Sequence, residues 1–458
     1  MGWAQMIGND AGIDWDQAVH VYMNVIACES EDLQIKATIQ LARLSKDAPE
    51  AILASTIPVL VDLLSSTSRM QEAAVYALSC IAHKHDGRLC PMICQLEAIS
   101  LLLRLLPTSK EGLRRTLLKC LRTLVSFDGP SRLILAANGG LDITLDLLSR
   151  CTDDTRRYLL EILTALALLR EVRRVLTGFD VLRFLVEALS NGKMISRARA
   201  AQTIGVLAIS RRVRQKLVDL GVIPALIGFL KEADSSYRLV AGNALGIISS
   251  HVDYLRPVAQ AGAIPLFVEL LKGPEPLGKE IAEDAFCVLA VEEENGVMIT
   301  EEMVRVLEGD ADDAKGAALD IVWDLAGYRH SISVVRESGA IPVLVDLLRN
   351  MDGNLREKAS GAIAQLSYDA ANREAIVEAG AIPVLIDLLR GDPEEVREYA
   401  AECLLNFAED PLHRERVSEA YAVPSFLAIQ DRLIRIRASD EHIFRSMSTP
   451  NVERFISH

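Results

Sequence analysis

A ten-residue segment, Gly-Xaa-Ile-Pro followed by six mostly apolar residues, recurs along the chain. It reads GVIPALIGFL from Gly221, GAIPLFVELL from Gly262, GAIPVLVDLL from Gly339 and GAIPVLIDLL from Gly380. Repetition at such spacing is typical of chains that stack one small helical unit many times. One unit cannot bury its own apolar face, so the copies must pack on one another into a continuous core. The repeat therefore overrides the roughly three compact domains that the length alone suggests.

More divergent copies keep this register over the rest of the chain. Aligned on the proline position, the copies are separated by 42, 42, 41, 41, 41, 36, 41, 41 and 41 residues. The aligned positions are Pro58, Ser100, Asp142, Arg183, Pro224, Pro265, Glu301, Pro342, Pro383 and Pro424. The interval of 36 indicates a deletion near Asn295. In that repeat we expect a short or irregular first helix, with a kink or an exposed acidic loop.

One repeat, taken in detail, predicts three helices. The stretch from Asn372 has helical apolar spacing and ends at Gly380, which can adopt the left-handed conformation that terminates a helix. A second helix has Pro383 in its first turn, where the missing N–H costs little. Asp392 can cap a third helix that runs to about Ala408. The expected buried side of this third helix consists of Val396, Tyr399, Ala400, Cys403, Leu404 and Phe407.

Three helices per unit, the Ile-Pro of the second helix and the AxxLxNFA pattern within Ala400–Ala408 resemble armadillo repeats. The likeness is strongest to the armadillo regions of plant U-box proteins and of vacuolar-protein-8-like adaptors. It implies an all-α fold, a right-handed armadillo-repeat superhelix (α-solenoid) of about ten three-helix repeats, whose concave groove binds extended peptides and partner proteins. We expect a helical cap over 1–30, the armadillo array over 31–431, and a capping helix with a polar tail over 432–458.

Composition and charge exclude several classes of function. Half of the residues are apolar but only 5% are aromatic, which suits helices packed through aliphatic side chains. The net charge of −14 argues against binding nucleic acid. Neither a signal peptide nor a membrane-length apolar run is visible, so a membrane location is not expected. The cysteines at Cys80, Cys120, Cys287 and Cys403 fit apolar helical patterns, which favours reduced thiols in a cytoplasmic and/or nuclear protein.

The resemblance also implies where a ligand would lie. In related arrays an Asn recurs on the third helix and holds the ligand backbone, with a Trp one turn earlier in cargo-binding nuclear import receptors. Here the Asn register holds Arg43, Cys80, Thr123, Ala165, Val206, Ile247, Val288, Asp324, Gln365 and Asn406. One turn earlier lie Ile39, Tyr76, Lys119, Glu161, Gln202, Asn243, Asp284, Asp320, Gly361 and Glu402. With one Asn and no Trp in these rows, import of basic nuclear signals is not expected. The apolar positions at the centre either accept a partner's helix or strand or pack against neighbouring helices.

The chain carries a basic block. Between Arg104 and Lys216 there are 21 basic and 10 acidic residues, which favours an acidic partner, although exposed arginines also simply solvate helices. Arg132, Arg173 and Arg214 recur every 41 residues and belong to the repeat itself. The arginines and lysine outside that register are Arg170, Arg174, Arg211, Arg212 and Lys216, where an acidic partner or a phosphate group would bind.

An acidic block follows. From Glu275 to Asp324 there are 15 acidic and 3 basic residues, which predicts either binding of a basic partner segment or a solvated acidic face. Trp323 lies in this block, as an interface anchor or as a core-filling ring. The remaining predicted partner-binding residues are Lys119, Asn243, Asp284, Asp320, Asp324, Gln365, Glu402 and Asn406.

Sequence motifs predict no catalytic residue, cofactor or metal site. Gly-rich phosphate loops, GxSxG elbows and HExxH helices do not occur. Cys80, His83, His85, Cys90 and Cys94 lack the paired spacing of a zinc site, and GDADDAKG from Gly309 lacks ligands of a calcium loop. In the tail, RSMSTP (445–450) matches the pattern that 14-3-3 proteins bind when Ser448 is phosphorylated; the alternative is a plain polar tail.

The functional hypothesis is a non-enzymatic adaptor or scaffold in signalling or protein turnover. Direct ubiquitin-ligase activity is not expected, because no stretch long enough for a U-box precedes the first repeat. One alternative is an armadillo-type exchange factor that engages a small GTPase through an acidic groove near Asp320 and Asp324. Another is a substrate receptor for a separate ubiquitin ligase.

Overall fold

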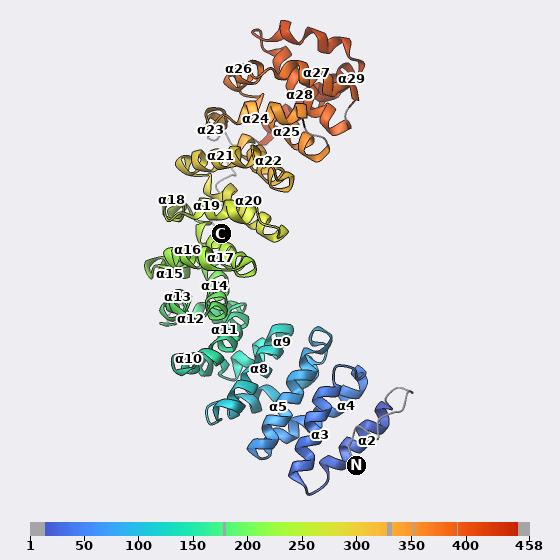
Figure 1. The fold of residues 1–458 in the computed structure, drawn as a ribbon, viewed down its shortest axis with the longest axis vertical. Helices are drawn as coiled ribbons and strands as arrows, with labels where there is room; N and C mark the ends of the chain where they lie inside the picture. The colour runs from blue at the N-terminus through green and yellow to red at the C-terminus, as the bar shows by residue number, and fades with distance from the viewer. Residues whose placement is uncertain (1–13, 177–179, 328–331, 351–352, 392, 448–458) are drawn as a thin grey trace. The chain divides into compact units, whose positions relative to one another are not determined.

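The computed structural model describes residues 14–176, 180–327, 332–350, 353–391 and 393–447. In these ranges the chain forms α-helices and short 3-10 helices, and no strand. The chain divides into two compact units, which we call the first unit (Met1–Ala233) and the second unit (Asp234–His458). Each unit is a stack of short helices that recur in the predicted order, so the all-α solenoid is confirmed (Figure 1).

The first unit begins with two helices and continues with repeats of two shorter helices and a longer third one. Its helices are α2 (Trp15–Ile26), α3 (Glu31–Leu44), α4 (Glu50–Asp62), η1 (Leu63–Ser65), α5 (Ser68–His83), η2 (Lys84–Gly87), α6 (Cys90–Gln95), α7 (Ala98–Leu105), α8 (Glu111–Phe127), α9 (Gly129–Ala137), α10 (Gly140–Arg150), α11 (Asp153–Ala167), α12 (Arg170–Leu176), α13 (Val181–Asn191), α14 (Met194–Ala208), α15 (Arg211–Asp219) and α16 (Val222–Glu232).

The second unit continues the same pattern. Its helices are α17 (Ser235–Ser249), α18 (Val252–Gln260), α19 (Ala263–Leu271), α20 (Pro276–Leu289), α21 (Glu293–Leu307), α22 (Asp312–Gly327), α23 (Ile332–Glu337), α24 (Ala340–Asn350), α25 (Gly353–Leu366), α26 (Ala370–Glu378), α27 (Ala381–Gly391), α28 (Glu394–Glu409), η3 (Arg414–Ala422) and α29 (Pro424–Met447). Helix α29 runs without a break through position 431, where we had placed the end of the array.

The third helices form the contact between repeats. In the first unit α3, α5, α8, α11 and α14 each pack on the next, and in the second unit α17, α20, α22, α25 and α28 do the same. Five of the six side chains predicted for the apolar face of α28 are buried, since Val396, Ala400, Cys403, Leu404 and Phe407 are at most 1% exposed, and the sixth, Tyr399, is half-buried. Covering these side chains removes from water the apolar area that a lone repeat would leave exposed.

A turn separates the first and second helices of most repeats, and glycine makes it possible. Gly221 and Gly380 have φ angles of +84° and +76°, a conformation that side-chain-bearing residues rarely adopt. In the first repeat Ser55 stands in the register of this glycine, and α4 continues straight through the Ile-Pro step. There the two helices are joined into one, whereas in the next repeat Glu97 stands in the same register, adopts a left-handed φ of +57° itself, and keeps the turn.

The turn between the first and second helices is also missing from the repeat shortened near Asn295, and our expectation for that repeat was wrong. We expected a short or irregular helix with a kink or an acidic loop. Instead, α21 is one regular helix of 15 residues. The deletion removes the turn and its glycine, so the first and second helices fuse. Asn295 is buried within α21, and its side-chain amide donates to the Leu289 carbonyl at 3.1 Å.

The arginines that recur every 41 residues have a structural role. Each donates to carbonyl oxygens at the end of the preceding third helix, where no intrahelical donor is left. Arg132 Nε reaches the Val125 carbonyl at 2.7 Å, Arg173 Nη1 the Ala167 carbonyl at 2.8 Å, and Arg214 Nε the Ala208 carbonyl at 2.9 Å. Arg373 and Arg414 make the corresponding bonds in the second unit. The recurring arginines are thus a feature of the repeat, as their register predicts.

Replacing Arg214 by Met tests this role. Arg214 is 8% exposed, so its loss leaves the Ala208 carbonyl without its donor and is expected to lower the free energy of unfolding by about 1–3 kcal/mol. The control is Arg211→Met on the same helix, where the side chain is exposed and the effect is expected to stay within about 0.5 kcal/mol. Urea unfolding followed by far-UV circular dichroism measures both, and equal losses would contradict a structural role specific to Arg214.

Candidate functional site

A basic hollow of about 530 Å³ lies on the third helices α3, α5 and α8 of the first unit. We call it the basic pocket. Its lining consists of Ala42, Arg43, Ser45, Lys46, Tyr76, Ser79, Cys80, His83, Lys84, Lys119, Arg122 and Thr123. None of these lining residues is acidic. The pocket brings Lys119, which the sequence singled out, together with five further basic or imidazole side chains.

Three cations of the basic pocket are uncompensated. The side chains of Arg43, Lys46 and Lys119 are exposed, and in the described ranges none of them forms an ion pair. Two of these cations also affect Cys80 in the pocket wall. Burial raises the pKa of the Cys80 thiol, whereas the positive charges of Lys119 and Lys46 act to lower it. A hollow surrounded by cations without counter-ions can accept carboxylate or phosphate groups.

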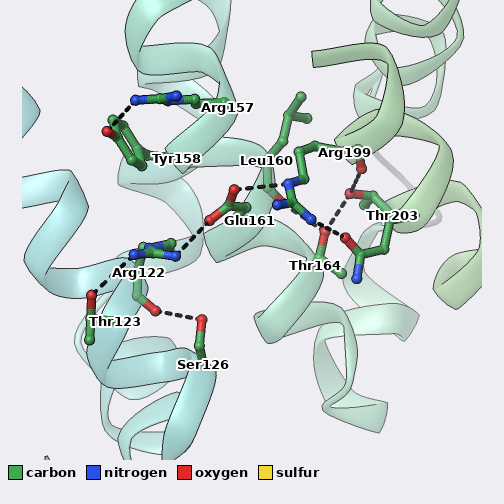
Figure 2. Close-up of polar contacts among 11 residues, drawn as sticks. Arg122, Thr123, Ser126, Arg157, Tyr158, Leu160, Glu161, Thr164, Arg199 and Thr203 are labelled. Atoms are coloured by element: carbon green, nitrogen blue, oxygen red, sulfur yellow. Dashed lines mark hydrogen bonds and ion pairs between the residues drawn. The ribbon is translucent and has the colours of Figure 1, made fainter. Parts of the chain in front are cut away.

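The other basic side chains of the pocket have partners. Lys84 donates to the Ala48 carbonyl, and Arg122 lies 3.4 Å from Glu161. Glu161 also pairs with Arg199 at 2.8 Å, so this one carboxylate, 16% exposed, connects α8, α11 and α14 (Figure 2). Arg122 and Arg199 share this single negative charge, so Arg122 adds less to the positive charge of the pocket than Arg43, Lys46 and Lys119 do.

Buried hydroxyl contacts hold the same helices together. Thr164 on α11 and Thr203 on α14 lie 2.6 Å apart and are both buried (Figure 2). Each hydroxyl also has its own helix's carbonyl one turn earlier as a partner, at 2.8 Å. The two hydroxyl protons are shared among these three contacts, and polar groups paired across such an interface favour one register between the helices. The spacing of side chains along the third-helix face is thereby set.

A second hollow of about 440 Å³ lies near α12 and the start of α15. We call it the arginine pocket; it is lined by Arg170, Arg173, Arg174, Ile209, Ser210 and Arg212. Three of the predicted residues meet here, because Arg170, Arg174 and Arg212 are exposed and line one space. Arg211 and Lys216 are exposed on α15 outside this lining.

Acidic side chains gather on the third helices of the second unit. Asp284 is exposed, Asp320 pairs with Lys358 at 2.5 Å, and Asp324 accepts a hydrogen bond from the Cys287 thiol at 3.4 Å. Burial and the nearby Asp320 carboxylate raise the pKa of Glu283. The part of this shift that comes from Asp320, Asp284 and Glu280 reflects neighbouring negative charge, which a cationic partner would relieve.

The predicted polar residues around this surface differ in availability. Asn243 is exposed, Gln365 is half-buried, and Glu402 accepts a hydrogen bond from the Tyr368 hydroxyl. The structure corrects the prediction for Asn406, which is 6% exposed and donates to the Ser367 hydroxyl at 2.7 Å. Its amide stabilises the contact between α25 and α28 and is not presented to a ligand.

Trp323 packs across neighbouring third helices. Its ring meets Tyr399 of α28 edge to face, with centroids 5.3 Å apart. A Cβ on Gly361 of α25 would lie 2.5 Å from the Trp323 ring, so the glycine makes room for it. The half-buried ring thus fills space between repeats, as the core-filling interpretation predicts.

Some residues of the basic pocket escaped the sequence prediction. Arg43 and Tyr76 stand in the two third-helix rows, but a single charge or ring in a row gives no sign of a hollow. Lys46 lies beyond the rows, and only its proximity to Lys119 in space makes it part of a site. Ser448 lies outside the described residues. In the described part of the chain, no three His, Cys, Asp or Glu side chains converge as metal ligands would, and no helix has the length and apolarity to span a membrane.

Comparison with known proteins identifies the repeat. The armadillo/β-catenin-like repeat family matches residues 329–368 and 369–409. The crystal structure of an engineered protein from a structural genomics consortium superimposes with a TM-score of 0.68 at 22% identity, covering 85% of this chain and 98% of that one. A second engineered protein, 25% identical, covers 50% of this chain and 98% of its own with a TM-score of 0.39. A search of curated proteins finds no match.

Residues 329–409 therefore match armadillo repeats, and the chain has the all-α solenoid fold. Armadillo repeats generally mediate protein–protein interactions and typically form non-enzymatic scaffolds. The finer likeness to plant U-box proteins and vacuolar adaptors stays a prediction.

Replacing Gly361 by Ala tests the packing of Trp323. The added methyl must displace the ring, which is expected to lower the free energy of unfolding by about 1–3 kcal/mol and shift tryptophan emission. Gly246→Ala is the control, a glycine on a third helix with open space around it, expected to stabilise by about 0.5–1 kcal/mol. Emission is recorded with Trp3 and Trp15 replaced by Phe, so that Trp323 reports alone. Unchanged emission in Gly361→Ala would argue against this packing.

Proposed function

We propose that the protein is an adaptor that binds acidic segments of partner proteins in the basic pocket of its first unit. The observation that carries the proposal is the 530 Å³ hollow without an acidic lining residue, around which Arg43, Lys46 and Lys119 have no ion-pair partner among the residues that the structure describes. In a folded protein most cations near one another are compensated, so an uncompensated group favours an external anion. Tyr76, 37% exposed, adds an aromatic surface against which a partner side chain can pack.

The second unit supports binding of a basic partner segment. Its third helices carry the exposed Asp284 and Asp324, the Trp323 and Tyr399 rings meet edge to face, and burial together with four glutamates raises the pKa of the Tyr399 hydroxyl. Carboxylates around aromatic rings suit lysine and arginine side chains. Two surfaces of opposite charge would let one adaptor hold two different partners.

Affinity purification from the native cell, with quantification of partners by mass spectrometry, tests the adaptor function. Arg43→Glu/Lys119→Glu is expected to reduce recovery of an acidic partner by about tenfold or more, because two cations of one pocket are reversed. Arg104→Glu/Lys231→Glu, the same charge change at exposed residues elsewhere in the first unit, is the control and is expected to retain that partner. Identical partner lists for both variants would overturn the proposal.

The basic-partner surface has its own variant. Trp323→Ala/Asp324→Lys is expected to lose a different, basic partner and to keep the acidic one. Because the replacement of Trp323 removes packing, Asp284→Lys/Asp324→Lys serves as a second variant that leaves the ring in place. Loss of the same partner from both variants would assign the loss to charge.

An exchange factor for a small GTPase is the alternative that the acidic surface favours, through a basic GTPase segment near Asp320 and Asp324. A nucleotide-release assay with a panel of GTPases separates the two functions. Release that accelerates at substoichiometric protein would replace the adaptor proposal. Stable co-purification of a ubiquitin ligase would instead support a substrate-receptor role.

Two further points are proposals. A cytoplasmic and/or nuclear location is supported by the eight free cysteines, which a reducing compartment maintains. Phosphorylated Ser448 would provide a separate 14-3-3 binding site, because a phosphate after Arg445 and before Pro450 has the required pattern.

A further inference from the structure

Three large apolar side chains are exposed at the same position of consecutive repeats in the first unit. Phe127, Leu168 and Ile209 are 40%, 49% and 60% exposed and follow one another every 41 residues. Each lies at the carboxyl end of a third helix, namely α8, α11 and α14. Because these helices pack one on the next, the three side chains follow one edge of the unit. We call this row the apolar strip.

The arginine pocket borders the apolar strip. Ile209 belongs to both, and Arg173 is bound to the carbonyls of Ala167 and Leu168, each at 2.8 Å. Arg170 and Arg212 reach the same hollow, and in the described ranges neither side chain has a hydrogen bond or ion pair. A row of exposed apolar side chains beside guanidinium groups without partners is unusual on a protein surface. Such a surface would suit a ligand that is both apolar and acidic.

We propose that the apolar strip and the arginine pocket together bind an acidic amphipathic helix of a partner protein. Packed helices are spaced about 8–10 Å apart, so side chains of the strip recur at about that distance. In an α-helix every seventh residue lies on the same face and advances about 10.5 Å along the axis. A partner helix with apolar residues seven apart therefore places one on each repeat.

The positive charges beside the apolar strip favour the same kind of ligand. Acidic residues that flank the apolar positions of the partner helix would reach Arg170, Arg174 and Arg212, whose planar guanidinium groups suit carboxylates. A β-strand would fit poorly, because its same-face residues recur about every 7 Å. The arginine pocket is recessed around Ile209, so it can enclose one apolar side chain of the helix. This inference rests on the proposed adaptor function only in requiring a protein partner, and it uses a different surface.

A designed peptide provides the probe. The sequence is three heptads of LAAEEAA, blocked at both ends, in which Ala favours the helix, Leu recurs every seventh residue, and Glu three and four residues later lies on either side of the Leu row. Fluorescence anisotropy with the full chain measures its Kd. Two companion peptides, one with Ser for Leu and one with Gln for Glu, are expected to bind at least about tenfold more weakly.

Variants of the protein locate the binding site. Leu168→Ser/Ile209→Ser and Arg170→Gln/Arg212→Gln are each expected to raise the Kd at least about tenfold. All four side chains are exposed, so the fold is expected to persist, and circular dichroism checks this. Matched controls are Val252→Ser/Leu277→Ser, which removes exposed apolar side chains of the second unit, and Arg104→Gln/Arg115→Gln; both are expected to stay within about twofold.

Three results would overturn the inference. The first is no binding of the probe to the wild-type chain, and the second is equal affinity of the site variants and their controls. The third is co-sedimentation with phosphatidylcholine/phosphatidylserine vesicles that the same variants abolish while the peptide does not bind, which would assign the strip to a membrane surface. Arg43→Glu/Lys119→Glu is expected to leave the Kd of the probe unchanged, so failure here and failure of the basic-pocket proposal remain distinguishable.

Discussion

Every surface of this protein depends on the packing of one third helix against the next. A single repeat has too little apolar area to stay folded, and its third helix is covered only when the neighbouring repeats cover it. Side chains 41 residues apart in sequence consequently become neighbours in space. The buried contact between Thr164 and Thr203, whose hydroxyls lie 2.6 Å apart, shows how closely such neighbours fit. The basic pocket, the arginine pocket and the apolar strip all draw their residues from successive repeats.

Arginine has two roles in this chain, and local geometry separates them. The guanidinium groups of Arg173 and Arg214 donate hydrogen bonds to carbonyls at helix ends, whereas Arg170 and Arg212 line the arginine pocket. Glu161 adds a further distinction, because Arg122 and Arg199 share its single negative charge. Net charge over a stretch of sequence is therefore a poor guide to where the protein attracts an anion. What matters is which cations keep their charge uncompensated at the surface.

The opposite charges of the two units provide a physical basis for the proposed adaptor function. Long-range fields guide a charged segment toward a surface, and contacts made at short range then decide whether it stays. In the first unit these contacts would come from exposed cations and Tyr76, and in the second from carboxylates near Trp323. An acidic amphipathic helix on the apolar strip would add apolar contact to the charge. Each surface thus selects a partner by a different combination of the same forces.

The sequence by itself determined the repeat, its three helices and most of the buried face, because apolar periodicity, helix caps and turn glycines act over a few residues. It also identified Lys119 by its place in a third-helix row, and Arg170 and Arg212 by their excess over the repeat register, both of which are visible in one dimension. Only the tertiary structure decided that α21 is a single helix and that Asn406 is internal. Only the tertiary structure likewise decided that Arg43 and Lys46 line one pocket with Lys119. These outcomes depend on which side chains of different repeats meet, and packing sets those distances.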